Sequence, residues 1–90
     1  MAIGCRAISN GNNSVAIGVD AQTQGGGAVA MGQGSAATAQ NSTAVGNFAA
    51  ASGLRASAFG TNTVASGLDS LAQGSFAAAG AQNAVALGFQ

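Results

Sequence analysis

Glycine recurs at every seventh position along nearly the whole of this 90-residue chain, and no other feature constrains its fold as strongly. The column contains Gly4, Gly11, Gly18, Gly25, Gly32, Gly46, Gly53, Gly60, Gly67, Gly74 and Gly88, and only Ala39 and Ala81 interrupt it. This regularity is typical of a solenoid, in which one small unit is stacked many times and each copy contacts its neighbours.

The columns between the glycines show that the true period is two glycine units, or fourteen residues. Ala, Ser or Thr always stands three positions after the glycine position, and Ala nearly always follows two positions later. The position before the glycine alternates between a large apolar set and a polar set. It holds Ile3, Ile17, Met31, Val45, Phe59, Gln73 and Leu87 in one set of units, and Asn10, Gln24, Thr38, Ser52, Ser66 and Gly80 in the other.

The four charged residues give an independent indication of the same period. Arg6 lies fourteen residues before Asp20, and Arg55 lies fourteen residues before Asp69. If one coil contains fourteen residues, each pair of opposite charges is expected to meet on neighbouring coils.

Helical structures do not fit this pattern. A coiled coil needs regularly spaced apolar residues on good helix formers, whereas a glycine inside a helix costs about 1 kcal/mol relative to alanine. Collagen needs glycine at every third residue and abundant proline, and this chain has no proline. The alternating side chains instead predict strands of about four or five residues, joined by tight turns in which Gly and Asn adopt positive φ. Asn13, Asn41, Asn62 and Asn83 stand at the expected turn position.

Two strands and two turns per coil predict an all-β parallel β-roll whose 14-residue coils stack about 4.8 Å apart. Alternation places the Ala and Ser columns inside, so the two sheets are expected to lie close together. An alanine core is weak for so small a domain, whereas the outward columns of alternate strands form an apolar stripe. We therefore expect several copies to pack this stripe around a common axis. The expected interface residues are Ile3, Val15, Ile17, Val29, Met31, Val45, Phe59, Leu71, Val85 and Leu87.

Three short runs identify a family that the chain resembles. Residues 13–18 read N-S-V-A-I-G, residues 41–46 read N-S-T-A-V-G, and residues 83–88 read N-A-V-A-L-G. These runs are similar to the head repeat of the trimeric autotransporter adhesins, the YadA-like head. The resemblance implies a left-handed roll, a homotrimer, and a place on the bacterial cell surface above a stalk and an outer-membrane anchor outside these residues.

The family resemblance implies attachment to host cells or to an extracellular-matrix protein such as collagen. Asn13 and Ser14 belong to the run that the resemblance connects with collagen, although Val15 and Ile17 are expected to serve the interface and Ala16 the core. Phe48 and Phe76 occupy the turn position held elsewhere by Asn or Asp, two coils apart on one edge, and are further candidates for ligand contact. A structural spacer within a long surface fibre is the alternative function. An ice-binding solenoid is disfavoured, because its outward threonine rows are missing.

The residue inventory argues against other classes of function. The chain has no His, Lys, Glu, Tyr or Trp to act in general acid and base catalysis, so we expect no enzymatic activity and no cofactor. Metal ligands are lacking, and two Arg balanced by two Asp cannot form a basic nucleic-acid footprint. No apolar run approaches the roughly 20 residues of a membrane span. Cys5 is a lone thiol whose role is open, with a disulfide between copies as one alternative.

Both ends of the sequence lie inside a repeat, so residues 1–90 are expected to form a single head segment that is truncated at both ends. Gln73 is the exception within the large apolar column. An axial layer of hydrogen-bonded side chains or a bound ion among the copies would account for it.

Overall fold

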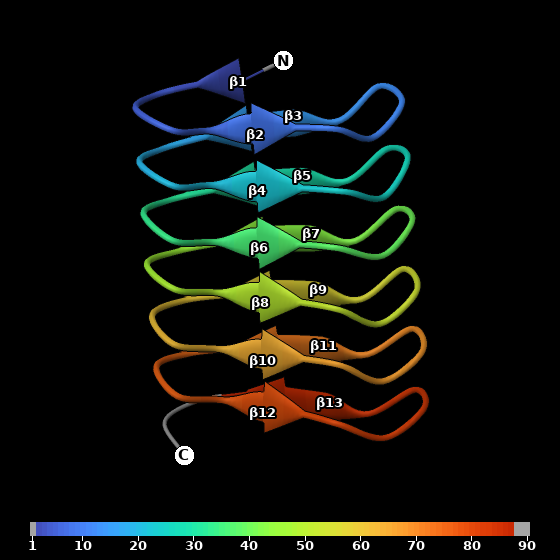
Figure 1. The fold of residues 1–90 in the computed structure, drawn as a ribbon. Helices are drawn as coiled ribbons and strands as arrows, with labels where there is room; N and C mark the ends of the chain where they lie inside the picture. Colours follow the sequence, from blue (N-terminus) through green and yellow to red (C-terminus); the bar gives the residue numbers. More distant parts are fainter. Residues whose placement is uncertain (1, 88–90) are drawn as a thin grey trace.

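A computed structural model describes residues 2–87, which form a flat roll of thirteen short strands without any helix (Figure 1). The strands are β1 (Ala2–Ile3), β2 (Ile8–Ser9), β3 (Val15–Ile17), β4 (Gln22–Thr23), β5 (Val29–Met31), β6 (Ala36–Ala37), β7 (Thr43–Val45), β8 (Ala50–Ala51), β9 (Ser57–Phe59), β10 (Val64–Ala65), β11 (Leu71–Gln73), β12 (Ala78–Ala79) and β13 (Val85–Leu87). Met1 and Gly88, the last glycine of the column, lie outside the described residues.

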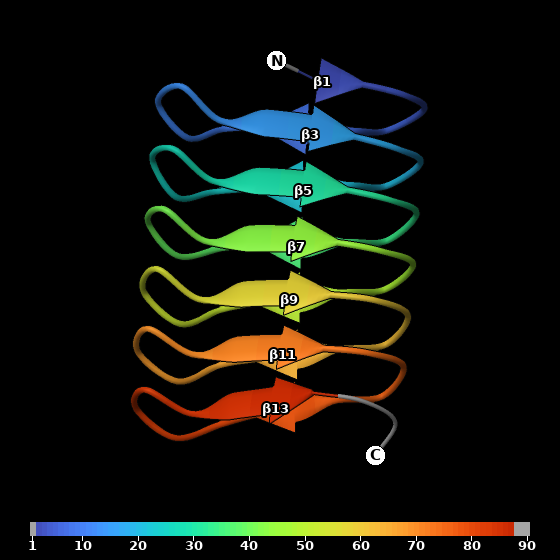
Figure 2. The same ribbon diagram turned by 180° about the vertical axis from the view of Figure 1, so that it is seen from behind.

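The strands alternate between two sheets, so each coil contributes one strand to each sheet (Figures 1 and 2). The odd-numbered strands form a seven-stranded sheet in the order β1-β3-β5-β7-β9-β11-β13, and the even-numbered strands form a six-stranded sheet in the order β12-β10-β8-β6-β4-β2. Every pairing is parallel, and the Cα partners are fourteen residues apart, as in Ala16 with Ala30 and Ala37 with Ala51. The predicted all-β parallel solenoid with a 14-residue coil is confirmed. Its handedness and its trimeric assembly stay predictions.

The strands are shorter than the four or five residues expected from the sequence. Strands of the six-stranded sheet have two residues, and those of the seven-stranded sheet have three, apart from the two-residue β1. The cause is the turn, because four of the seven residues in each half coil belong to it and few remain for the strand.

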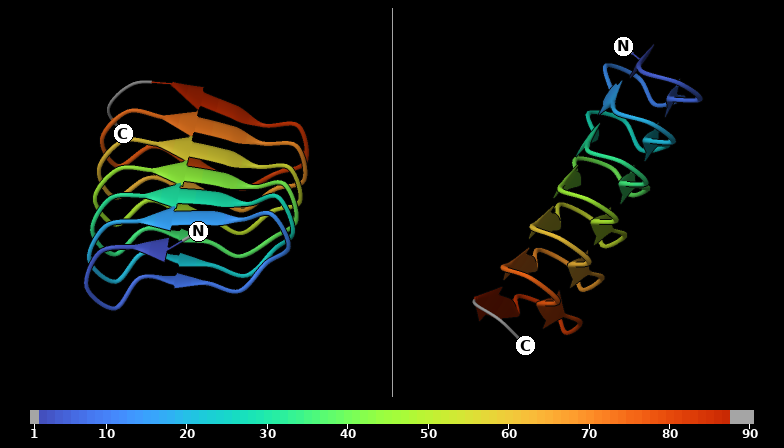
Figure 3. Two further views of the ribbon diagram at one scale, coloured as in Figure 1. Left: turned by 90° about the horizontal axis from the view of Figure 1, so that it is seen from above. Right: turned by 90° about the vertical axis from the view of Figure 1, so that its left-hand side faces the viewer.

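The turns form the two opposite edges of the roll (Figure 3). We call one the Phe edge, made of residues 4–7, 18–21, 32–35, 46–49, 60–63 and 74–77, and the other the Asn edge, made of residues 11–14, 25–28, 39–42, 53–56, 67–70 and 81–84. The third residue of each turn has positive φ, for example 58° at Asn13 and 62° at Phe48. The amide of the fourth residue donates to the carbonyl of the first, as in Ala7 N to Gly4 O at 3.3 Å. Positive φ at the third position is the mark of a type II turn.

The glycine column contains two kinds of position, which differ in the backbone angle φ and look alike in the sequence. The first glycine of each Phe-edge turn has φ between 118° (Gly74) and 132° (Gly46), where an L side chain is strained. The corresponding residues of the Asn edge have no such φ, and Ala39 and Ala81 both fall there. The two interruptions of the column therefore occur on the edge where φ does not require glycine, although a Cβ added to a remaining glycine of that edge, such as Gly11, would clash with the backbone of the next coil.

The core is built from alanine and small hydroxyl residues, as predicted. Residues such as Ala16, Ala30 and Ala44 are fully buried between the sheets. The hydroxyls of Ser14, Ser35, Ser42 and Thr63 donate to the carbonyl of the first residue of their own turn, at 2.6 to 3.1 Å. The column is restricted to Ala, Ser and Thr because the space is small. Four of its five hydroxyls bind the turn, and Ser70 does not. The roll measures 30 × 21 × 10 Å along its principal axes, so it is thin in one direction.

Candidate functional site

The described residues enclose no pocket, because alanine and serine side chains fill the narrow space between the sheets. Within residues 2–87 no group of three or more His, Cys, Asp or Glu side chains is placed to hold a metal ion. The same residues contain no helix long and apolar enough to cross a membrane. The candidate sites are therefore surfaces: two sheet faces and two edges.

The outer face of the seven-stranded sheet carries all ten residues expected at the interface. We call this surface the apolar face; it comprises the outward residues of the odd-numbered strands. Parallel pairing aligns them in two columns, with Val15 beside Val29 and Ile17 beside Met31. Side chains in the middle of the face, such as Ile17 and Phe59, are half-buried within the single chain. At its ends, Ile3 and Leu87 are 52% and 67% exposed.

The outer face of the six-stranded sheet has a different chemistry. Its outward residues next to the Asn edge are polar or small, and Asn10, Gln24, Thr38, Ser52 and Ser66 are exposed. Its second outward column, from Ile8 through Ala36 and Ala50 to Ala78, follows no regular order. The large apolar residues are thus concentrated on one of the two faces.

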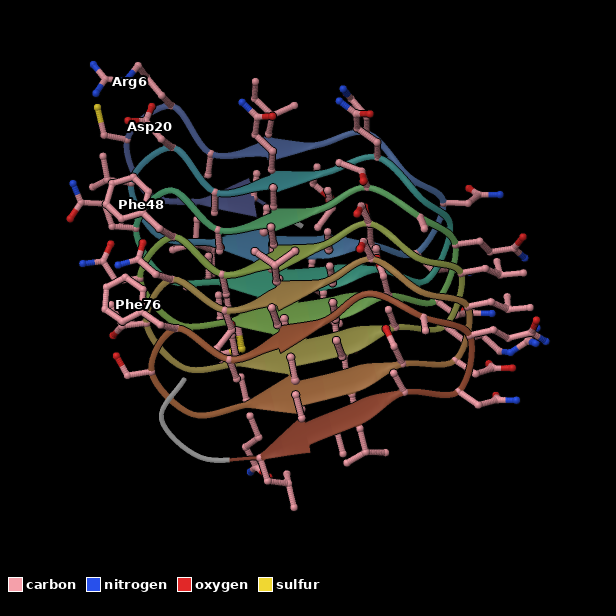
Figure 4. The ribbon with its side chains drawn as sticks, turned by 90° about the horizontal axis from the view of Figure 1, so that it is seen from below. Arg6, Asp20, Phe48 and Phe76 are labelled. Atoms are coloured by element: carbon pink, nitrogen blue, oxygen red, sulfur yellow. The ribbon has the colours of Figure 1, made fainter. Side chains whose placement is uncertain are left out.

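Phe48 and Phe76 project from the Phe edge two coils apart (Figure 4). They are 55% and 51% exposed, and their φ angles of 62° and 63° are uncommon for an aromatic residue. Each corner is held by the coil before it, since Phe48 N donates to Gln33 O at 2.8 Å and Phe76 N to Thr61 O at 2.9 Å.

The Phe48 ring lies against Gly34, at the same corner of the preceding coil. A Cβ added to Gly34 would come within 2.8 Å of two ring carbons of Phe48. Glycine at this corner therefore leaves the space that the ring uses.

Asn13 and Ser14 lie on the Asn edge, away from the two phenylalanines. Asn13 is exposed at the third position of its turn. Ser14 is only 3% exposed; its hydroxyl donates to Gly11 O at 2.7 Å and lies 2.6 Å from Ser9 Oγ. The structure thus places the Ser14 side chain inside the roll, where a surface ligand does not contact it. The four candidate ligand residues do not form one site.

The two ion pairs expected from the spacing are confirmed, one on each edge. Arg6 pairs with Asp20 on the Phe edge, and Arg55 pairs with Asp69 on the Asn edge, each with Nε 2.6 Å from Oδ1. The hydrogen bond from each arginine lowers the pKa of its aspartate, and the same bond raises the pKa of the arginine. Both pairs are solvent-exposed and neutral overall, so no face carries a strong charge.

Two buried hydroxyls have surroundings that the sequence did not predict. The hydroxyls of Thr23 and Ser70 are buried and have no hydrogen-bond partner within the described part of the chain. Thr23 stands in a column otherwise made of Ala, with Ser9 as the only other exception, and this irregularity was the only signal available. Cys5 is an exposed free thiol on the Phe edge.

Comparison with known proteins gives a match along the whole chain. The family model of the YadA head domain repeat, which spans two copies of the repeat, matches residues 1–21, 9–35, 23–49, 37–63, 51–77 and 65–90. From residue 9 onward successive matches begin fourteen residues apart, the same interval as one coil. No curated protein matches the chain.

Proposed function

Because the chain belongs to the family of YadA head domain repeats, we propose that residues 1–90 are one head segment of a trimeric autotransporter adhesin. In this proposal three copies, each wound left-handed as the family implies, assemble through the apolar face. The segment stands on the bacterial cell surface, above an anchor that lies outside these residues.

The apolar face is the observation that carries the proposal. The core of a single chain consists of alanine and small hydroxyl residues, whereas Ile17, Met31, Val45, Phe59 and Leu71 lie together on the outer surface. Burying each large side chain contributes about 1.5–3 kcal/mol. Assembly thus supplies the burial that the core of one chain lacks.

Light scattering coupled to size-exclusion chromatography tests the assembly. We expect a mass three times that of the 8.4 kDa chain across the concentrations at which the protein is folded. A folded monomer at those concentrations would contradict the proposal.

Within the assembled head, the edges present side chains for attachment to a host matrix protein such as collagen. Phe48 and Phe76 support this part of the proposal, because both residues are more than half exposed on corners that backbone hydrogen bonds hold in place. Aromatic residues, Phe among them, are enriched in the cores of protein interfaces. Three identical edges in one head would allow individually weak contacts to act together.

Binding of the trimer to immobilised collagen and other matrix proteins tests the attachment. The informative variant is Phe48→Asn with Phe76→Asn, because Asn adopts positive φ at the same turn position in other coils. The matched control is Leu54→Asn, which removes an exposed apolar side chain from the opposite edge. We expect the phenylalanine variant to bind at least about tenfold more weakly, a loss of roughly 1.4 kcal/mol, and the control to bind normally.

A structural spacer within a surface fibre is the second candidate function. The observation that favours it is the continuous ladder of parallel pairing from β1 to β13, which makes the stack a uniform rod. A trimer that binds none of the matrix proteins in the same assay would support this function.

A further inference from the structure

Gln73 is the one amide in the column of large residues that borders the Phe edge on the apolar face. Ala72 beside it is fully buried, so alternation along β11 directs Gln73 outward. Its partners on the neighbouring strands are Phe59 and Leu87, and the Gln73 side chain itself is exposed. An amide thus stands between two large apolar residues on the surface that we propose to be the interface.

Strand β9 carries the largest side chain of the apolar face beside a small one. In β9 the large Phe59 shares the face with the small Ser57, whereas Ile17 in β3 shares it with the medium-sized Val15. A solvent-exposed surface does not limit the size of its side chains. When identical faces pack around an axis, however, a large side chain leaves little room for its neighbour on the same strand. Phe59 with Ser57 therefore points to packing against other copies at the same level.

We propose that Gln73 sets the axial register of the assembled copies, an inference that rests on the proposed trimer. The Nε2 group of Gln73 in each copy donates a hydrogen bond to Oε1 of Gln73 in the next copy around the axis. A primary amide has both a donor and an acceptor, so identical side chains related by rotation satisfy one another. Neither a carboxylate nor an ammonium group has both.

Register needs such a residue because the coils are nearly equivalent. If one copy slides by one coil, Ile17 meets Met31 and Met31 meets Val45, so most apolar residues still face apolar residues. In the same slide Gln73 meets Phe59 or Leu87, and its amide is left buried without a partner, which is unfavourable. A single polar residue in an apolar seam specifies register in coiled coils for the same reason.

Disulfide trapping measures the register directly. One chain carries Met31→Cys and a second carries Val45→Cys. Both also carry Cys5→Ser and have tags of different mass, and the two chains are refolded together and oxidised. Disulfides between residues 31 and 31 report the aligned register, and those between 31 and 45 report a slide of one coil. We expect the ratio of the second to the first to rise about tenfold when Gln73→Leu is introduced into both chains. With Gln73→Asn, which keeps the amide, the rise is expected to be smaller.

The control is Gln24→Leu, which makes the same exchange on the six-stranded sheet and is expected to leave the ratio unchanged. A trimer whose ratio is the same with and without Gln73→Leu would overturn the role of Gln73 while leaving the trimer intact. Failure of Gln73→Leu chains to assemble would also overturn it, because leucine fits an apolar seam. A native chain that is monomeric by light scattering would instead remove the proposed trimer and this inference together.

Discussion

Arg6 and Asp20 meet across two neighbouring coils, with Arg6 Nε 2.6 Å from Asp20 Oδ1 and Arg6 Nη2 3.1 Å from Asp20 Oδ2. The same two-point contact joins Arg55 to Asp69 on the opposite edge. Two parallel bonds between a guanidinium and a carboxylate require a defined geometry. Each pair therefore helps to align two successive coils at a corner of the roll.

These pairs predict a small loss of stability in acid. Hydrogen bonds from Arg6 and Arg55 hold the pKa values of Asp20 and Asp69 below the ordinary 3.8. A carboxyl group whose pKa is lower in the folded state stabilises the fold above its unfolded pKa, and this contribution is lost as the pH falls through the folded pKa. We expect the melting temperature to decrease slightly between about pH 5 and pH 2, since both pairs are exposed and screened.

The double variant Asp20→Asn with Asp69→Asn is the control for the acid effect. The chain has two Asp, no Glu and no His, so few other groups titrate in this range. The melting temperature of the variant should stay nearly constant across the same pH range. A decrease as large as that of the native protein would show that the pairs are not its cause.

Ala44→Leu should destabilise the roll by overpacking. Ala44 is fully buried between two sheets in a molecule only 10 Å thin, and added methylene groups in a packed core cost about 1–3 kcal/mol. Thermal unfolding followed by circular dichroism measures the effect. The exposed, outward Ala78 is the matched site, and Ala78→Leu should change the melting temperature little. Equal effects of both variants would contradict the inward position of Ala44.

Gly46→Ala should destabilise the roll through backbone strain. Gly46 has φ of 132°, and a Cβ added there would clash with the carbonyl oxygen of Gly60. Strain of this kind costs about 1–3 kcal/mol. Gly80→Ala is the control, because the nearest atom to its added Cβ is Ser66 Oγ at 3.7 Å. Urea unfolding of the two variants should show a clear difference in midpoint, and similar midpoints would argue against the left-handed requirement.

Ile17→Asp should weaken assembly, whereas Gln24→Asp should not. Ile17 lies on the apolar face, so the change removes about 1.5–3 kcal/mol of burial per copy and brings like charges together. Gln24 is exposed beyond the end of β4, on the six-stranded side. Sedimentation equilibrium gives the association constant of each variant. If the two substitutions reduce association equally, the roll does not assemble through the apolar face.

Local patterns in the sequence predicted most of the coil. The seven-residue glycine interval with its alternating neighbours gave the two half coils, and alternation along each strand placed Ala16 and Ala44 inside and Ile17 outside. The spacing of Arg6 and Asp20 predicted their contact. These predictions succeeded because side-chain direction in a strand and positive φ in a turn depend on a few consecutive residues.

The candidate binding residues were predicted less completely. Phe48 and Phe76 could be assigned to one exposed edge from their turn position, but the fit of the Phe48 ring against Gly34 required the neighbouring coil. Ser14 was a ligand candidate through the family run although its column was expected to face inward, and only the structure gave the partners of its hydroxyl, Gly11 O and Ser9 Oγ. The sequence alone does not show whether the hydroxyl of a serine in this column faces a ligand or the carbonyl of its own turn.

The sequence by itself determined the length of the coil, the identity of the inward columns and the family, because each of these depends on residues that lie close together along the chain. The tertiary structure alone decided which glycines must adopt the left-handed conformation, how short the strands are, and which hydroxyls are buried without a partner. These features depend on how each coil rests on the next, through contacts such as that between Gly46 and Gly60. No seven-residue window contains both members of such a contact, so only the stacked molecule defines it.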